Sequence, residues 1–341
     1  MDPVAPRGGG AADLSRFRRL VTATLVATFV LILIGGIVRV SDSGLGCGPE
    51  GSGTHGWPLC EGGVLPAASA ESVIEYSHRI TAGIVGVLML MTAWHAWRHL
   101  REHRWIVGGS IAGGVLVLAQ AGLGGLTVEE GLHEYLVAAH LGLAMLFLGV
   151  LLALRRQGSE PQPVEASGGR GLRALTLVAA TLILGTIVAG GLVAGTEGEG
   201  TPTEPVRGAH TACGEQFPTC VDRFMPFGED RLIDIQLVHR SFMYLAAIAV
   251  LALVIVAVRQ RARSRAFLAL GGLLVGQIAL GAANVWLGKH AGLILAHLTL
   301  GTIIWATAVY AWTTLMPVPA PRSETVRRPD AATGTATAQM S

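Results

Sequence analysis

Residues 120–144 read QAGLGGLTVEEGLHEYLVAAHLGLA, and residues 277–301 read QIALGAANVWLGKHAGLILAHLTLG. The two stretches align without a gap, so that His140 falls on His297 and His133 on His290. Self-similarity at a fixed offset is the sequence signature of a duplicated structural unit. The chain is therefore expected to contain the same unit twice.

The repeat extends toward the N-terminal side of both stretches. EYSHR at residues 75–79 matches QLVHR at residues 236–240, which places His78 on His239. Two adjacent glycines in each half also match: Gly35, Gly36, Gly190 and Gly191. The duplicated unit thus covers most of the chain.

The composition is that of a membrane protein. Of the 341 residues, 51% are hydrophobic and 14% are charged, which excludes an ordinary soluble enzyme. Eight apolar runs are long enough to cross a bilayer core of about 30 Å, where a backbone without water must be helical. The predicted spans are Leu20–Val40, Val73–Trp94, Trp105–Leu126, Tyr135–Leu154, Leu172–Ala194, Ile235–Val258, Ala266–Leu287 and Ala291–Leu315.

Four spans fall in each half of the chain. Because four is an even number, both halves enter the membrane from the same side, which makes the repeats parallel. We predict an all-α polytopic membrane protein whose eight transmembrane helices form two parallel-repeat four-helix bundles. The expected divisions are a cytoplasmic N-terminal tail at 1–19, four-helix halves at 20–154 and 173–315, a cytoplasmic linker at 155–172 and a disordered cytoplasmic tail at 316–341.

Arginine is concentrated before the first span and after the second, fourth, sixth and eighth spans. The positive-inside rule places these segments, and so both termini, in the cytoplasm. The intervening loops carry glutamates and face outward. The N-terminus lacks the features of a cleaved signal or a transit peptide, so we expect a multi-pass protein in the cell membrane of a bacterium.

All four cysteines fall in the outward loops as two local pairs, Cys47 with Cys60 and Cys213 with Cys220. Disulfides persist on that side of the membrane, and we therefore expect two of them. Each disulfide would staple a loop, and a redox role in a reaction is the alternative.

Four histidines lie inside the spans at matched depth, one to two turns below the outer helix ends: His78, His140, His239 and His297. An ionisable side chain in a span is costly and suggests a function. Imidazoles from two helices of one bundle can be the axial ligands of a heme iron, so each half is predicted to hold one heme. Core histidines bonded to backbone carbonyls are the alternative. Zinc is disfavoured because no cysteine or carboxylate completes a ligand set.

Three further side chains flank these histidines. Arg79 and Arg240 could pair with heme propionates or extend toward the interface. Glu75, where the other half has Gln236, precedes His78 by one turn, and it could be a proton acceptor or charge stabiliser, or a capping residue. The remaining histidines outside the repeat are expected at solvated positions: His55, His95, His99, His103 and His210.

The chain resembles the heme A synthase family from about residue 18 to residue 315. The motifs that carry the resemblance are SDSGLGCG at 41–48, GWPLC at 56–60, EYSHR at 75–79, AAH at 138–140, LVHR at 237–240 and LAH at 295–297. The resemblance implies oxidation of the C8 methyl group of heme o to a formyl group, which gives heme a for terminal oxidases. Two hydroxylations would give a gem-diol that loses water, with Glu75 matching the essential glutamate of the family.

The resemblance also implies a division of labour. His239 and His297 would hold a resident heme b, and His78 and His140 would face heme o as substrate. The implied partners are heme o and heme a, membrane lipid, a heme o synthase, an electron donor or acceptor and a second copy of the chain, with no nucleic acid. One departure is an insertion at residues 48–56, which lengthens the first outer loop and weakens the case for the Cys47–Cys60 pairing.

Two other functions fit the histidine pattern. One is a two-heme cytochrome that passes electrons from a quinol without modifying its hemes. The other is a heme exporter or chaperone that uses the same ligands for transient binding. Glu75 discriminates the enzyme from the cytochrome, and a low-spin bis-histidine spectrum retained after purification would count against transport.

Overall fold

The computed structural model describes residues 10–159, 169–196, 208–262, 264–288 and 290–316. These residues form eight α-helices and a short 3₁₀ helix at Gly53–His55, and they contain no strand. All eight α-helices are long and apolar enough to cross a membrane, which confirms the predicted all-α polytopic class. The helices are α1 (Ala11–Val40), α2 (Ala70–His99), α3 (Arg104–Glu129), α4 (Glu134–Gln157), α5 (Arg170–Gly195), α6 (Arg231–Arg259), α7 (Ala266–Trp286) and α8 (Ala291–Thr314).

Several helices extend beyond the predicted spans. Helix α1 begins at Ala11, before the predicted start at Leu20. The prediction followed the apolar run, which marks only the part in the bilayer, and residues 11–19 contain no glycine or proline that would end the helix. Helices α2 and α6 begin after capping residues. The Ser69 side chain accepts from the Ser72 backbone N–H at 3.1 Å, and the Asp230 side chain accepts from the Leu232 backbone N–H at 2.8 Å.

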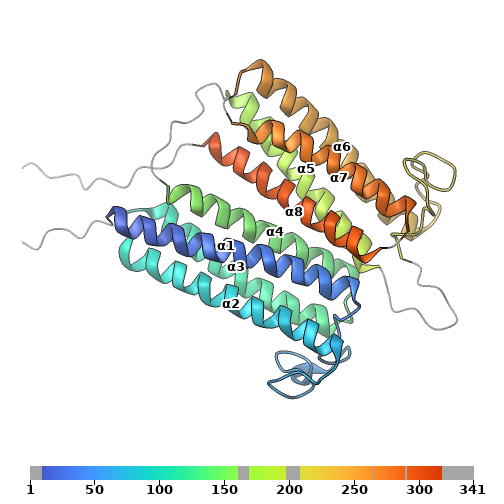
Figure 1. Ribbon diagram of the computed structural model, residues 1–341, viewed down its shortest axis with the longest axis horizontal. Coiled ribbons are helices and arrows are strands. Elements are labelled where there is room, and N and C mark those ends of the chain that lie inside the picture. The colour runs from blue at the N-terminus through green and yellow to red at the C-terminus, as the bar shows by residue number, and fades with distance from the viewer. Residues whose placement is uncertain (1–9, 160–168, 197–207, 263, 289, 317–341) are drawn as a thin grey trace, which may run out of the picture.

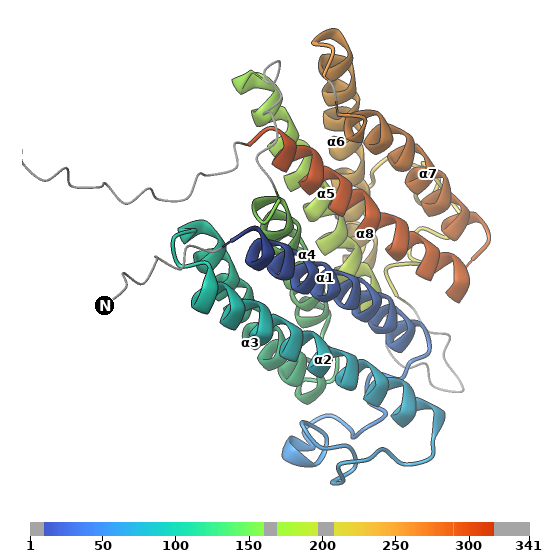
Figure 2. The ribbon, with the colours of Figure 1, turned by 60° about the vertical axis from the view of Figure 1, so that its left-hand side comes forward.

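Contacts between helices close a ring within each half of the chain. Helix α1 contacts α2 and α4, and α3 contacts α2 and α4; in the same way α5 contacts α6 and α8, and α7 contacts α6 and α8. Figure 1 and Figure 2 show α1–α3 and α5–α8 on opposite sides, with α4 beside α1. This pattern agrees with two four-helix bundles, although the arrangement as parallel repeats and the domain ranges stay predictions.

The two halves meet through α1, α4, α5 and α8. Small residues line this contact, as is common where membrane helices pack closely. A Cβ added at Gly36 would lie 2.6 Å from Leu298 Cδ2, and one at Gly191 would lie 2.9 Å from Ala138 Cα. A buried hydrogen bond of 2.7 Å from Trp305 Nε1 to the Met145 carbonyl also joins α8 to α4. The halves are therefore packed without room for larger side chains at these points.

The two cysteine-bearing loops lie at the same end of the helices, and the start of α1 and the end of α8 lie at the opposite end (Figure 1). The Sγ atoms of Cys47 and Cys60 are 2.02 Å apart, and those of Cys213 and Cys220 are 1.98 Å apart. Both pairs are thus at disulfide distance, as the sequence predicted, including the pair in the longer loop. Residues 160–168 of the predicted linker at 155–172, residues 1–9 of the predicted N-terminal tail and residues 317–341 of the predicted C-terminal tail lie outside the described residues.

Candidate functional site

The structure places the four intramembrane histidines on four different helices, two in each half. His78 lies on α2 and His140 on α4, and His239 lies on α6 and His297 on α8. All four side chains are half-buried. Each half thus presents two imidazoles from two different helices.

In His239 the ring nitrogens are arranged so that Nε2 is available as a ligand. His239 Nδ1 lies 2.9 Å from the Thr186 carbonyl oxygen on α5. A carbonyl only accepts, so Nδ1 carries the hydrogen, and in a neutral imidazole Nε2 then keeps its lone pair. The corresponding Nδ1 atoms of His78, His140 and His297 are buried and have no hydrogen-bond partner among the described residues.

Each of the four rings lies against a glycine of the preceding helix. A Cβ added to that glycine would lie 3.0 or 3.1 Å from the Cε1 atom of the ring, closer than ordinary van der Waals contact. The pairs are Gly35 with His78, Gly124 with His140, Gly190 with His239 and Gly281 with His297. The same contact therefore occurs four times, on α1, α3, α5 and α7.

The donor set in each half fits a heme. The described residues contain no group of three or more His, Cys, Asp or Glu side chains that could hold a bare metal ion. A heme brings its own macrocycle nitrogens to the iron, so the two imidazoles of each half would be sufficient to hold it. The histidine pairs thus match the requirement of heme and fall short of that of a structural zinc ion.

Glu75 is 3% exposed, and both of its carboxylate oxygens have partners. Oε2 accepts from the backbone N–H of Cys47 at 2.7 Å, and Oε1 pairs with Nη2 of Arg79. The carboxylate is therefore fixed between the outer loop and α2, one turn from His78. In the other half Gln236 is also buried, at 5% exposed, and its Oε1 atom has no hydrogen-bond partner in the described structure.

Arg79 and Arg240 hold the two outer loops. Arg79 Nη1 donates to the carbonyls of Gly56 at 2.6 Å and Leu59 at 2.8 Å. Arg240 donates in the same way from Nη1 to the carbonyl of Thr219 and from Nη2 to that of Gln216, at 2.8 and 2.9 Å. These arginines thus have a structural part that the sequence did not predict. Their pairing with heme propionates stays a prediction.

A protein-family model described as "Cytochrome oxidase assembly protein" matches residues 18–309. The chain belongs to the COX15-CtaA family. A relative from Shouchella clausii, named "Heme A synthase", is 30% identical over 283 residues, which are 79% of this chain and 86% of the relative. Proteins of the same name from Bacillus licheniformis and Halalkalibacterium halodurans are 36% identical over 133 residues and 28% identical over 209 residues. These matches cover 38% and 60% of this chain, and 41% and 64% of the two relatives.

The COX15-CtaA chain has a further internal match that the sequence analysis missed. GWPLC at residues 56–60 corresponds to QFPTC at residues 216–220, an aromatic residue followed by Pro, any residue and Cys. The first and fourth residues of each motif supply the carbonyls that the arginine binds. Comparing the loops, as well as the spans, would have found this signal.

Two histidines expected at solvated positions, His210 and His95, are covered by neighbouring segments; His103 is half-buried as well, whereas His55 and His99 are exposed as expected. His210 is half-buried and lies close enough to affect His239 and His297 electrostatically, because its neighbour Ala209 is tied to α5 by a 2.9 Å hydrogen bond to Thr196. His95 is 5% exposed, and its Nε2 lies 3.0 Å from the Asp13 carbonyl. The prediction for His210 was wrong because the loop before α6 folds back onto α5. The prediction for His95 was wrong because α1 begins early enough to cover it.

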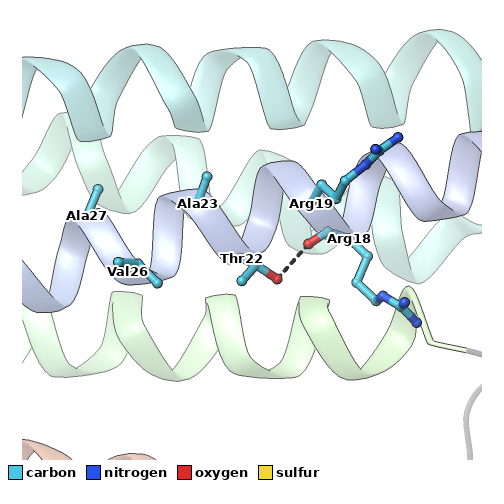
Figure 3. A pocket seen from close by; sticks show the side chains of 6 residues that line it. All are labelled: Arg18, Arg19, Thr22, Ala23, Val26 and Ala27. Carbon is cyan, nitrogen blue, oxygen red and sulfur yellow. Dashed lines mark hydrogen bonds between the residues drawn. The ribbon is translucent and has the colours of Figure 1, made fainter.

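A hollow on the surface of α1 lies apart from both histidine pairs (Figure 3). Thr22 lines it together with both neighbouring arginines, and its hydroxyl donates to the Arg18 carbonyl at 2.7 Å. The full lining is Arg18, Arg19, Thr22, Ala23, Val26 and Ala27. All of these residues precede Gly35 on α1 by two turns or more, so the hollow is not part of the candidate site.

Proposed function

We propose that this COX15-CtaA protein is a heme A synthase, an oxidoreductase that converts the C8 methyl group of heme o into a formyl group. The product, heme a, would serve cytochrome oxidase assembly. The observation that carries the proposal is a buried carboxylate one turn from His78 in one half, where the other half has an amide. The names of the relatives support the same function.

The two histidine pairs would have different occupants. We assign His239 and His297 to a resident heme b, and His78 and His140 to heme o as substrate. When bound, heme b supplies a route for electrons, while the protein orients the substrate and excludes competing reactions. Glu75 distinguishes the halves, because the N-terminal half has a carboxylate one turn before its histidine, where the C-terminal half has the amide of Gln236.

Glu75 is held in a fixed orientation for this task. The Cys47 N–H and the Arg79 guanidinium each bind one of its oxygens, so little ordering remains to be done when substrate arrives. Converting a methyl to a formyl group removes electrons and protons and adds an oxygen atom. The carboxylate would accept a proton at Oε1 or Oε2, or stabilise positive charge that develops at the reacting carbon. Gln236 can do neither.

The orientation in the membrane follows from the arginine pattern. We place both termini in the cytoplasm of a bacterium and both histidine pairs near the outer surface of the cell membrane. The electron acceptor and a heme o synthase would meet the protein there or within the bilayer. A second copy of the chain is a further expected partner.

The proposal is tested by heme extraction from cells that make heme o and carry this protein as their only source of heme a. Chromatography is expected to show heme a with the parent protein, and heme o without heme a with Glu75→Gln. Glu71→Gln, one turn earlier on α2 and exposed, is the matched control and should leave heme a unchanged. Absence of heme a with the parent protein would contradict the function. Undiminished heme a with Glu75→Gln would contradict the part given to the carboxylate.

A further inference from the structure

The four glycines that face the histidine rings have a more specific part than helix packing. We propose that Gly35, Gly124, Gly190 and Gly281 are positioning residues, which set the rotation and depth of the imidazoles and thereby the axial ligation in both halves. The inference rests on the proposed assignment of these histidines to heme iron. It concerns how the chain prepares its ligands, and it holds for either occupant.

The contact is the same in all four places. Each added Cβ would meet Cε1 of the ring first, at 3.0 or 3.1 Å, whereas ordinary contact begins at 3.4 Å. Cε1 is bonded to Nε2, the atom available to iron. An alanine at any of the four positions would therefore displace the ring, or the helix that carries it, by a few tenths of an ångström. Nε2 would move with the ring.

Other contacts hold the ring of His239 and the backbone of two further histidines. The Thr186 carbonyl accepts from His239 Nδ1 at 2.9 Å, which holds that ring from a second side. The side-chain amides of Gln120 and Gln277 donate to the backbone carbonyls of His140 and His297, both at 3.0 Å, which fixes the helix at those residues. The other three rings have no hydrogen bond from Nδ1 among the described residues, so for them the facing glycine is a contact that limits rotation.

Neighbouring glycines show that the requirement comes from the ring. Gly36 and Gly191, next in sequence to two of the four, face Leu298 and the backbone of Ala138 across the interface between halves. Gly122 on α3 and Gly272 on α7 have nothing within 4 Å of an added Cβ. On α1 and α5, then, one glycine faces the histidine and the next faces the other half, and on α3 and α7 one glycine faces the histidine and another faces nothing within 4 Å.

The test uses the full-length protein purified with its retained heme, and it needs no turnover. Gly281→Ala and Gly190→Ala are expected to shift the electron paramagnetic resonance spectrum of the oxidised low-spin heme and its midpoint potential. Both observables respond to the orientation and strength of the axial ligands. Gly272→Ala should shift neither observable. Gly191→Ala should lower the thermal unfolding temperature and leave the spectrum unchanged.

The outcomes separate positioning from packing. An unchanged spectrum and an unchanged potential in both Gly281→Ala and Gly190→Ala would overturn the inference. A shift in Gly191→Ala as large as the shift in those two variants would overturn it too. If Gly281→Ala does not accumulate, the decision falls to Gly190→Ala, whose ring keeps its bond to Thr186. A parent protein that shows a low-spin heme spectrum but produces no heme a would contradict the proposed function. In that case the spectra of Gly281→Ala and Gly190→Ala would still decide this inference.

Discussion

The N-terminal and C-terminal halves share one frame and differ in what lies beside it. In both halves an arginine directly after the histidine binds two carbonyls of an aromatic–Pro–X–Cys loop motif, that of the residue before the aromatic and that of the residue before the cysteine. In the first half that arginine also pairs with Glu75, whereas in the second Arg240 lies over the Phe217 ring, 5.5 Å from its centroid. A repeated scaffold thus carries two different sites, and the difference is confined to one helical turn and the loop above it.

The loops above the two sites differ in a second way. The Trp57 ring of the first loop packs against α3, where a Cβ added at Gly125 would be 2.9 Å from the ring. In the second loop Phe217 contacts Trp286 of α7 edge-on, with 6.2 Å between the ring centroids. Three residues before the first cysteine, the first loop has Gly44 and the second has His210. The half that contains the buried Glu75 therefore has Trp57 packed on its helices, and the other half has His210 near His239 and His297.

The largest expected effect separates the occupants of the two halves. Replacing both His239 and His297 with Ala removes both ligands of the C-terminal site, so the purified protein is expected to lose its retained low-spin heme completely. His78→Ala should leave that heme in place, because the C-terminal ligands are untouched. Absorption spectra of the purified variants measure this directly. An unaltered spectrum in the double variant would show that the retained heme is held elsewhere.

The second prediction exchanges the side chains that distinguish the halves. Glu75→Gln is expected to lower the rate of heme a formation by about 10²–10⁴-fold, the usual contribution of a positioned acid or base. Adding Gln236→Glu should not restore the rate, because that carboxylate would lie beside the resident heme pair. The rate is measured from heme a extracted at successive times after heme o is supplied. Restoration by the exchange would mean that either half can carry the reaction.

Much of this arrangement could be predicted from the sequence, and the rest could not for physical reasons. Hydropathy and the repeat indicate the eight spans and the equivalence of the four histidines, because both are regular along the chain. The loop partners of Arg79 are the backbone carbonyls of Gly56 and Leu59, whose side chains give no signal of the contact, so only the match between the two loop motifs points to it. Gly124 gives no signal of its contact either, because a glycine in an apolar helix does not reveal that it faces His140 on the next helix.

A third prediction compares the two arginines through protein stability. Arg79→Gln leaves the buried Glu75 without its ion-pair partner, a change that typically costs about 3–5 kcal/mol. Arg240→Gln has no such partner to strand and loses only its two hydrogen bonds from a charged group, each worth about 1.5–3 kcal/mol, which Arg79→Gln loses as well. Denaturant unfolding in detergent should therefore find Arg79→Gln the less stable of the two.

A double-mutant cycle isolates the source of that difference. Adding Glu75→Gln to Arg79→Gln removes the stranded carboxylate, so the double variant should recover part of the lost stability. If the two single changes are simply additive, the ion pair does not cause the difference between the halves. Glu71→Gln in place of Glu75→Gln is the control, and it should give no recovery because Glu71 is exposed.

The smallest predicted effect tests where the two halves are alike. Gln120→Leu and Gln277→Leu each remove one hydrogen bond to a histidine carbonyl, at 3.0 Å in both halves. Polar contacts between membrane helices stabilise a protein by about 0.6 kcal/mol on average. Leucine also removes a buried Oε1 that has no partner in the described structure, which offsets part of the loss. Each change should therefore lower the free energy of unfolding by less than about 1 kcal/mol. Because the surroundings match, the two losses of unfolding free energy should agree within about 0.5 kcal/mol. A clearly larger loss for one glutamine would place a further difference between the halves at the base of the histidine helices, away from Glu75 and the loops.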